Sequence, residues 1–192
     1  IERFRERAQT PIFPQAVLPL QAIPGVQFVN EIPNPYNDTL LTAKVDHKIN
    51  TKQSMFYRFS FQDNSSPNDQ VANPARTDLS GGNESTNRLY SLAINHTYQI
   101  KPTVVNVFTY HFQDFVNEIL PNPSGIGLAL NFPDGISIGQ NANTPQSTIE
   151  RKHQFRNDTT WIKGDHTMKF GVNYINTLMD GYFYFGVRGY SL

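Results

Sequence analysis

Hydrophobic and polar residues alternate one by one along several stretches of this chain, the pattern of a β-strand with one apolar and one polar face. In residues 39–50, for example, Leu41 and Val45 alternate with Lys44 and Asp46. The pattern predicts six strands, near 39–50, 54–63, 88–101, 103–116, 151–163 and 166–175. The aromatic residues at 182–185 either extend the sixth strand or begin a seventh. No stretch repeats every ~3.6 residues, so we expect no substantial helix.

Short polar turns and long polar loops separate these strands in strict alternation. Tight turns are predicted at 50–53, 101–103 and 163–166, whereas long loops rich in Asn, Ser, Gly and Pro cover 64–87 and 117–150. Tight turns impose hairpins, so we expect an all-β, antiparallel up-and-down meander. Short turns at one end and long loops at the other are typical of an outer-membrane β-barrel. Ten residues that rise ~3.3 Å each, tilted by ~40°, cross its ~25 Å apolar layer.

The two faces of these strands are expected to meet different surroundings. The residues predicted to point outward to lipid are Leu41, Val45, Tyr57, Phe59, Ile94, Phe108, Tyr110, Phe170 and Val172. The residues predicted to point inward to a wet lumen are Lys44, Asp46, Arg58, Asn95, Gln113, Arg156 and Lys169. Aromatic residues fall near both ends of the apolar faces, which favours a membrane over a soluble core.

Composition and charge narrow the class further. The chain has 192 residues, enough for one domain, with 16 Lys+Arg against 16 Asp+Glu and no Cys. Balanced charge gives no reason to expect nucleic acid, and the absence of Cys excludes disulfides and thiol catalysis. No run of ~18 apolar residues is present, so no transmembrane helix is expected. Residues 1–38 carry six prolines and are predicted to be an irregular loop segment, followed by a partial barrel over 39–192.

Two blocks of sequence resemble barrel hairpins of TonB-dependent outer-membrane receptors. The first is Leu-Leu-Thr-Ala-Lys-Val-Asp-His-Lys-Ile-Asn at 40–50, followed by Ser-Met-Phe-Tyr-Arg-Phe-Ser-Phe at 54–61. The second, more specific block is Gln-Phe-Arg-Asn-Asp-Thr-Thr-Trp-Ile-Lys-Gly-Asp-His-Thr-Met-Lys-Phe-Gly-Val-Asn-Tyr at 154–174. Among these receptors, the two blocks are most similar to the Oar-like group, whose members carry a carboxypeptidase-regulatory-like domain. The resemblance covers roughly 39–175.

This resemblance implies a transporter of the bacterial outer membrane, a plugged barrel of ~22 strands that takes up a ligand with energy from the TonB complex. Its partners would be outer-membrane lipid, the plug and remaining strands of the same polypeptide, and TonB through regions outside this sequence. We therefore expect a fragment without a plug domain that transports nothing alone. The alternative is a soluble, secreted all-β binding module, for example one that binds carbohydrate.

No catalytic, cofactor-binding or metal site is predicted. The five His residues fall on different strands and both faces, without the close spacing of metal ligands. The oxygen-rich stretch 63–69 lacks the spacing of a calcium loop. We expect no enzyme. Ligand choice is expected to rest on the long loops 64–87 and 117–150, in which no single binding residue is assigned.

Overall fold

The computed structural model describes residues 33–69, 81–122, 129–131, 137–186 and 189–191. Of the segment 1–38 that was predicted to be irregular, residues 33–36 lack regular structure and the first strand begins at Asn37. Residues 1–32 lie outside the described residues, so the expectation for them stays a prediction.

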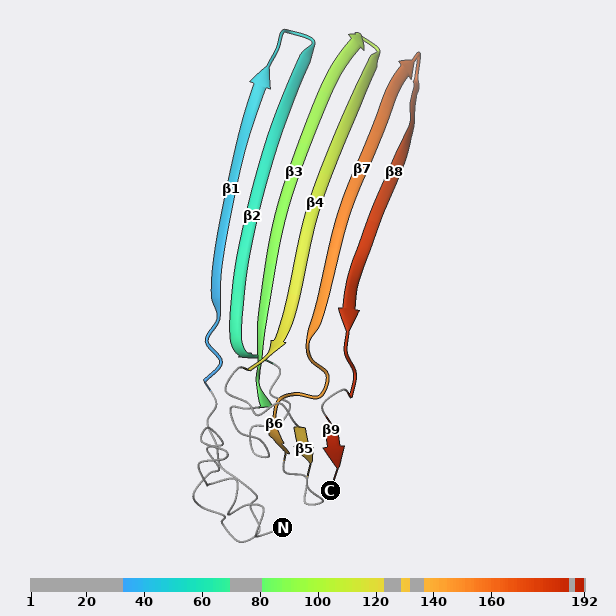
Figure 1. The fold of residues 1–192 in the computed structure, drawn as a ribbon. Coiled ribbons are helices and arrows are strands. Elements are labelled where there is room, and N and C mark those ends of the chain that lie inside the picture. Colours follow the sequence, from blue (N-terminus) through green and yellow to red (C-terminus); the bar gives the residue numbers. More distant parts are fainter. Residues whose placement is uncertain (1–32, 70–80, 123–128, 132–136, 187–188, 192) are drawn as a thin grey trace, which may run out of the picture.

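Six long strands lie side by side in one antiparallel sheet, in the order β1-β2-β3-β4-β7-β8 (Figure 1). Each pairs with the next long strand along the chain, which confirms the predicted up-and-down meander. The bounds are Asn37–Lys48 for β1, Gln53–Asp69 for β2, Asn83–Lys101 for β3, Val104–Pro121 for β4, Gln146–Lys163 for β7 and His166–Phe183 for β8.

Each of the three tight turns has its own chemistry. In the β1–β2 turn, Oδ1 of Asn50 accepts a 2.8 Å hydrogen bond from the backbone N–H of Lys52, as in an Asx turn. The β3–β4 turn consists of Pro102 and Thr103, where the fixed φ of proline suits a turn. In the β7–β8 turn, Gly164 has a φ of +58°, in the left-handed region that glycine adopts without strain.

The strands are longer at the loop end than the sequence pattern predicts. β2 continues to Asp69, β3 begins at Asn83, and β8 continues to Phe183. The 19 residues of β3 measure about 63 Å, or nearly 50 Å along the barrel axis at a ~40° tilt, roughly twice the apolar layer. Outside that layer the backbone ladder persists, but no face has to be apolar, so the alternation that marks a strand disappears.

A second, three-stranded sheet lies beyond the loop end of the long strands (Figure 1). It consists of β5 (Ala129–Asn131), β6 (Ser137–Gly139) and β9 (Gly189–Ser191). β5 pairs antiparallel with β6 and parallel with β9. The sequence pattern missed these strands because three residues are too few to show a period. The parallel pair is confined to this small sheet.

The six-stranded sheet is a single layer with no covering element among the described residues. Only Ala93, Ile119 and Ala129 are buried hydrophobic residues in this part of the chain. Large apolar side chains on the sheet remain exposed instead, such as Phe170 at 59% and Val172 at 65%. Within the described ranges there is also no helix long and apolar enough to span a membrane. A sheet with this much bare apolar surface requires an apolar surrounding.

The tight turns are staggered along the sheet. The row through Lys48, the last residue of β1 to pair, crosses β7 at Asp158, whereas β7 continues five residues further to Lys163. The stagger is about one residue per strand. If the turns lie at one height along the barrel axis, a shift of ~3.3 Å per strand over a spacing of ~4.8 Å corresponds to strands tilted by about 35° from that axis. A barrel wall requires a tilt of this kind.

Candidate functional site: the two faces of the wall

The strand registers divide the side chains into two faces. Leu41 pairs with Phe61, and Val45 with Tyr57; the row through Tyr57 continues through Ile94. We call the side that carries these residues the apolar face. All the residues predicted to point outward share it: Leu41, Val45, Tyr57, Phe59, Ile94, Phe108, Tyr110, Phe170 and Val172. The opposite side, the polar face, carries all those predicted to point inward: Lys44, Asp46, Arg58, Asn95, Gln113, Arg156 and Lys169.

The large apolar side chains on the apolar face form a belt, which we call the apolar belt. It crosses the strands obliquely and shifts from strand to strand in the same direction as the turns. The row through Ala43 of β1 reaches β8 at Asn176, but the apolar run of β8 lies closer to the turn, at Met168, Phe170, Val172 and Tyr174. A belt that crosses tilted strands at one level must shift in this way. Ring contacts fill it, including Tyr110 with Phe155 at 5.0 Å between centroids.

Charged residues mark the loop-side edge of this belt. Arg151 Nε lies 3.1 Å from Asp114 Oδ2 between β7 and β4. Asp63 and Arg88 face each other in the next row, between β2 and β3. At the turn end, Nζ of Lys163 lies 5.6 Å from the ring centroid of Trp161, a pair suited to a headgroup layer.

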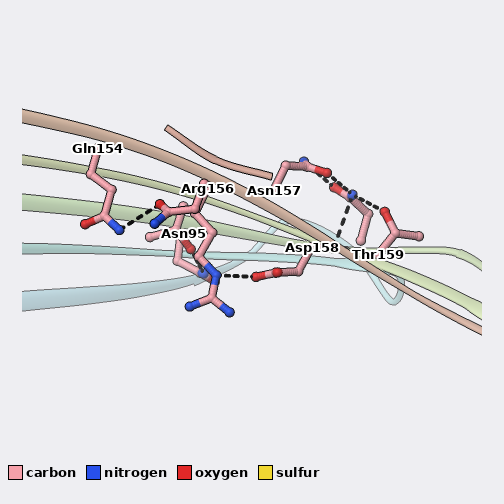
Figure 2. A network of polar contacts seen from close by, with 9 residues as sticks. Asn95, Gln154, Arg156, Asn157, Asp158 and Thr159 are labelled. Carbon is pink, nitrogen blue, oxygen red and sulfur yellow. Dashed lines mark hydrogen bonds and ion pairs between the residues drawn. The ribbon is translucent and has the colours of Figure 1, made fainter. Parts of the chain in front are cut away.

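A polar cluster interrupts the apolar face between β4 and β7. Asn106 Nδ2 donates to Asn157 Oδ1 at 2.8 Å and to Thr159 Oγ1 at 2.9 Å. Asn157 Nδ2 donates back to Asn106 Oδ1 at 3.2 Å. Figure 2 shows this cluster apart from the Arg156–Asp158 pair. The reciprocal bonds leave few amide groups unsatisfied, which reduces the cost of polar groups in an apolar setting.

Amide side chains form a ladder across the polar face near the loop end. Asn87 Nδ2 donates to Asn64 Oδ1 at 2.8 Å, and Asn117 Nδ2 donates to Asn87 Oδ1 at 2.8 Å. The ladder joins β2, β3 and β4. Gln62 Nε2 adds a bond to Asp38 Oδ1 at 3.0 Å, toward β1. This part of the wall is hydrophilic without net charge concentrated on it.

Nearer the turns, the polar face carries charges in short pairs along single strands. Lys44 Nζ lies 2.7 Å from Asp46 Oδ1, Lys152 Nζ lies 2.8 Å from Glu150 Oε1, and Arg156 Nε lies 2.6 Å from Asp158 Oδ2. The last pair is drawn in Figure 2, beside the hydrogen bond from Gln154 to Asn173. Each pair joins residues two apart, which share a face of a strand.

A hollow of about 720 Å³ opens at the turn end, lined mostly by residues of the turn and of the polar face. Its walls include Lys48, Phe56, Asn95 and Thr97. The hollow therefore lies mainly on the polar side of the sheet, next to the β1–β2 turn.

The loop end of the sheet is the most tightly packed part. Among the described residues, the buried side chains other than Ala93 lie at this end or in the small sheet beyond it, and Asn83 and Thr144 are fully buried. The segment 140–146 holds the strand ends together through its backbone: Tyr184 N–H donates to Pro145 O at 3.3 Å, and Gly186 N–H donates to Ala142 O at 3.0 Å. Backbone hydrogen bonds therefore hold the strand ends together on the loop side.

An apolar face with aromatic residues and an opposite polar face are the two surfaces of a transmembrane barrel wall. The sequence matches the family described as "Outer membrane beta barrel domain" over residues 7–190, nearly its whole length. The chain belongs to this family. No curated protein and no solved structure matches it. The protein resides in the bacterial outer membrane, with the apolar face toward lipid and the polar face toward the lumen of the barrel.

The five His residues are distributed over this outer-membrane barrel wall. His47, His96 and His153 lie on the lipid-facing side, His111 lies on the lumenal side, and His166 begins β8 at the turn. His153 bonds to Tyr110 at 2.9 Å and His96 to Gln53 at 3.1 Å, so both have protein partners. In the described ranges no three His, Asp or Glu side chains are grouped to hold a metal.

The two loops expected to contact a ligand are shorter than the sequence suggested. Residues 64–69 and 83–87 belong to β2 and β3, and 117–121 and 146–150 belong to β4 and β7. The alternation fails there because these strand ends extend beyond the membrane. Residues 70–80, 123–128 and 132–136 lie outside the described residues, so a role in ligand choice stays a prediction.

Proposed function

We propose that this chain is a wall segment of a TonB-dependent outer-membrane receptor, and that the full-length protein takes up a ligand through a plugged barrel. The sequence blocks at 40–61 and 154–174, which resemble such receptors, occupy the β1–β2 and β7–β8 hairpins at the two flanks of the sheet. This resemblance is the observation that carries the proposal.

The open geometry of the sheet supports a large barrel. β1 and β8 are not paired with each other in the described structure, and each leaves one edge without a neighbour. Unpaired backbone groups are costly in lipid, so further strands must continue the wall on both sides. A large, hydrophilic lumen suits a plug domain and a sizeable ligand.

A transport role also fits the chemistry of the wall better than the alternatives. Side chains of the lumenal face bond to one another, and we expect no enzymatic activity from them. A soluble binding module, the other function suggested by the sequence, is not compatible with outer-membrane residence and the exposed apolar belt.

The test measures ion conductance of the full-length protein in a planar bilayer in KCl. A plugged receptor is expected to show no steady conductance and to open reversibly when a denaturant unfolds the plug, because the hydrogen-bonded barrel resists denaturant better. Binding of the purified periplasmic domain of TonB to the same protein is expected as well. A constant conductance without denaturant, together with no TonB binding, would contradict the proposal.

A further inference from the structure

At the loop end of β3 and β4, burial differs sharply between the two faces of the same strand. In β3, Asn83 and Ser85 are buried, at 0% and 6% exposed, whereas Glu84 between them is exposed. In β4, Ile119 is 9% exposed, whereas Leu120 beside it is 39% exposed. Burial here follows the two-residue period of a strand, so one face is covered and the other is open.

The covered face is the lumenal one. Ser85 stands two residues before Asn87, and Ile119 two residues after Asn117, and both asparagines belong to the amide ladder of the lumenal side. Residues two apart share a face of a strand. Ser66 of β2, also buried, pairs with Ser85, and Ser85 pairs with Ile119. The three form one continuous buried row across β2, β3 and β4.

Small side chains alone do not explain this burial. Ser147 shows what small size does: it faces outward between its larger partners Glu118 and Tyr182 and is 7% exposed. Ile119 and Asn83 are full-sized side chains, yet they are as buried or more so. On a sheet of a single layer, such side chains lose contact with water only where other parts of the chain lie over them.

Two segments without regular structure border the buried row from its two flanks. Ahead of β1, Asn34 Oδ1 accepts a 2.7 Å hydrogen bond from Ser66 Oγ. Ahead of β7, the backbone O of Asn143 accepts a 2.7 Å bond from Nε2 of Gln146. Gln146 is the cross-strand partner of Ile119, and directly paired residues share a face, so its side chain also belongs to the lumenal side.

We propose that the segments 33–36 and 141–144 form a ledge on the lumenal side of the outer mouth, which narrows the entrance and limits the size of the solute that enters. The long loops of such barrels face the cell exterior, so a solute meets the ledge early. A layer packed on a sheet lies about 10 Å from it. The proposal rests on the proposed function, because it requires a solute that enters the lumen.

The first experiment locates the cover with thiol reagents, which suit a chain of 192 residues without Cys. Ser85→Cys and Glu84→Cys are introduced singly into the full-length protein, and their rates of reaction with a small maleimide are compared on intact cells. Ser85→Cys is expected to react about tenfold more slowly or less, because the cover must open first. Equal rates overturn the proposal. Ser66→Cys against Ser65→Cys gives the same comparison if Ser85→Cys does not fold.

A cross-link separates the ledge from a plug domain or any other cover. Asn34→Cys combined with Ser66→Cys is expected to form a disulfide on oxidation, because the two side chains are in contact. Asn34→Cys combined with Asp63→Cys, on the opposite face of β2, is the matched control and is expected to form none. If Ser85→Cys is protected but the first pair does not cross-link, another part of the polypeptide covers the row and the proposal is wrong.

The second experiment tests the size limit. Asn87→Cys, beside the buried row, is treated with a maleimide that carries a long polyethylene glycol chain. Ile119→Lys places a charge under the ledge and is expected to displace it, so that this reaction becomes about tenfold faster. Leu120→Lys, the same change on the open face, is the control and should leave the rate unchanged.

An equal effect of both lysine variants, or no effect of Ile119→Lys, overturns the size limit. Ile119→Ala, which removes the contact without adding a charge, replaces Ile119→Lys if that variant does not fold. A lumen that conducts ions without denaturant contradicts the proposed receptor function. The reaction rates and the cross-link still decide whether the ledge exists, so the two failures are distinguishable.

Discussion

The lipid-facing and lumenal sides of this wall are built from the same six strands, yet their polar and charged groups are partnered in different ways. On the lipid-facing side, polar groups satisfy each other in a closed cluster, as Asn106 and Asn157 do. On the lumenal side, charges occur in exposed pairs along single strands, and Arg58 has no acidic partner. Water in the lumen tolerates such groups, whereas lipid does not. Adjacent residues of one strand should therefore respond very differently to one substitution.

The largest effect is expected from a charge on the lipid-facing side. Phe108→Arg should lower the free energy of unfolding of the full-length protein by about 2–4 kcal/mol, because it places a cation near the middle of the bilayer. Its neighbour Val107 points to the lumen and pairs in register with Asp158, so Val107→Arg should cost less than about 1 kcal/mol. Denaturant titration in lipid vesicles measures both. Equal losses would show that the two faces are wrongly assigned.

A glycine of the third hairpin should give the next largest effect. A Cβ on Gly171 would lie 2.3 Å from the carbonyl O of Asn157, a backbone atom that cannot move aside freely. Gly171→Ala should therefore cost about 1–3 kcal/mol even though it faces the tolerant lumenal side. Gly164 is the control, because a Cβ there meets nothing within 4 Å and Asn accepts a positive φ. If Gly171→Ala and Gly164→Asn destabilise the protein equally, close strand approach is not the reason for the glycine.

The sequence alone predicts only part of this structure. Alternation identified the six strands and both faces, since one apolar and one polar side is what a membrane wall imposes. Tight turns determined the registers within hairpins. The register between β4 and β7 was not predictable, because a long loop joins them. The contact between Asn106 and Asn157 therefore could not be foreseen, although both lie on the apolar face in the sequence pattern.

That amide cluster offers a sharper test of the lipid-facing side. Asn106→Leu alone should cost about 1 kcal/mol, since it leaves Asn157 without its reciprocal partner in an apolar setting. The double variant Asn106→Leu with Asn157→Leu should recover most of that loss. A double-mutant cycle on the free energy of unfolding measures the coupling. Additive losses would indicate that each amide reaches water separately, and that the cluster is not covered by lipid.

The smallest effects on the free energy of unfolding are expected from two single ion pairs, one on each face. Arg156 and Asp158 are both exposed on the lumenal side, and dissolved ions screen such a pair, so Arg156→Gln should cost only a few tenths of a kcal/mol. Arg151 and Asp114 lie at the edge of the apolar belt, and Asp114 is 26% exposed. A lower local dielectric strengthens this second pair. Arg151→Gln should therefore cost more than Arg156→Gln, by up to about 1 kcal/mol.

Raising the salt concentration should weaken the lumenal pair further but change the outer pair less, because lipid limits the access of ions. If both variants show the same salt dependence in denaturant titrations, water surrounds the two pairs equally, and the belt ends before it reaches Arg151.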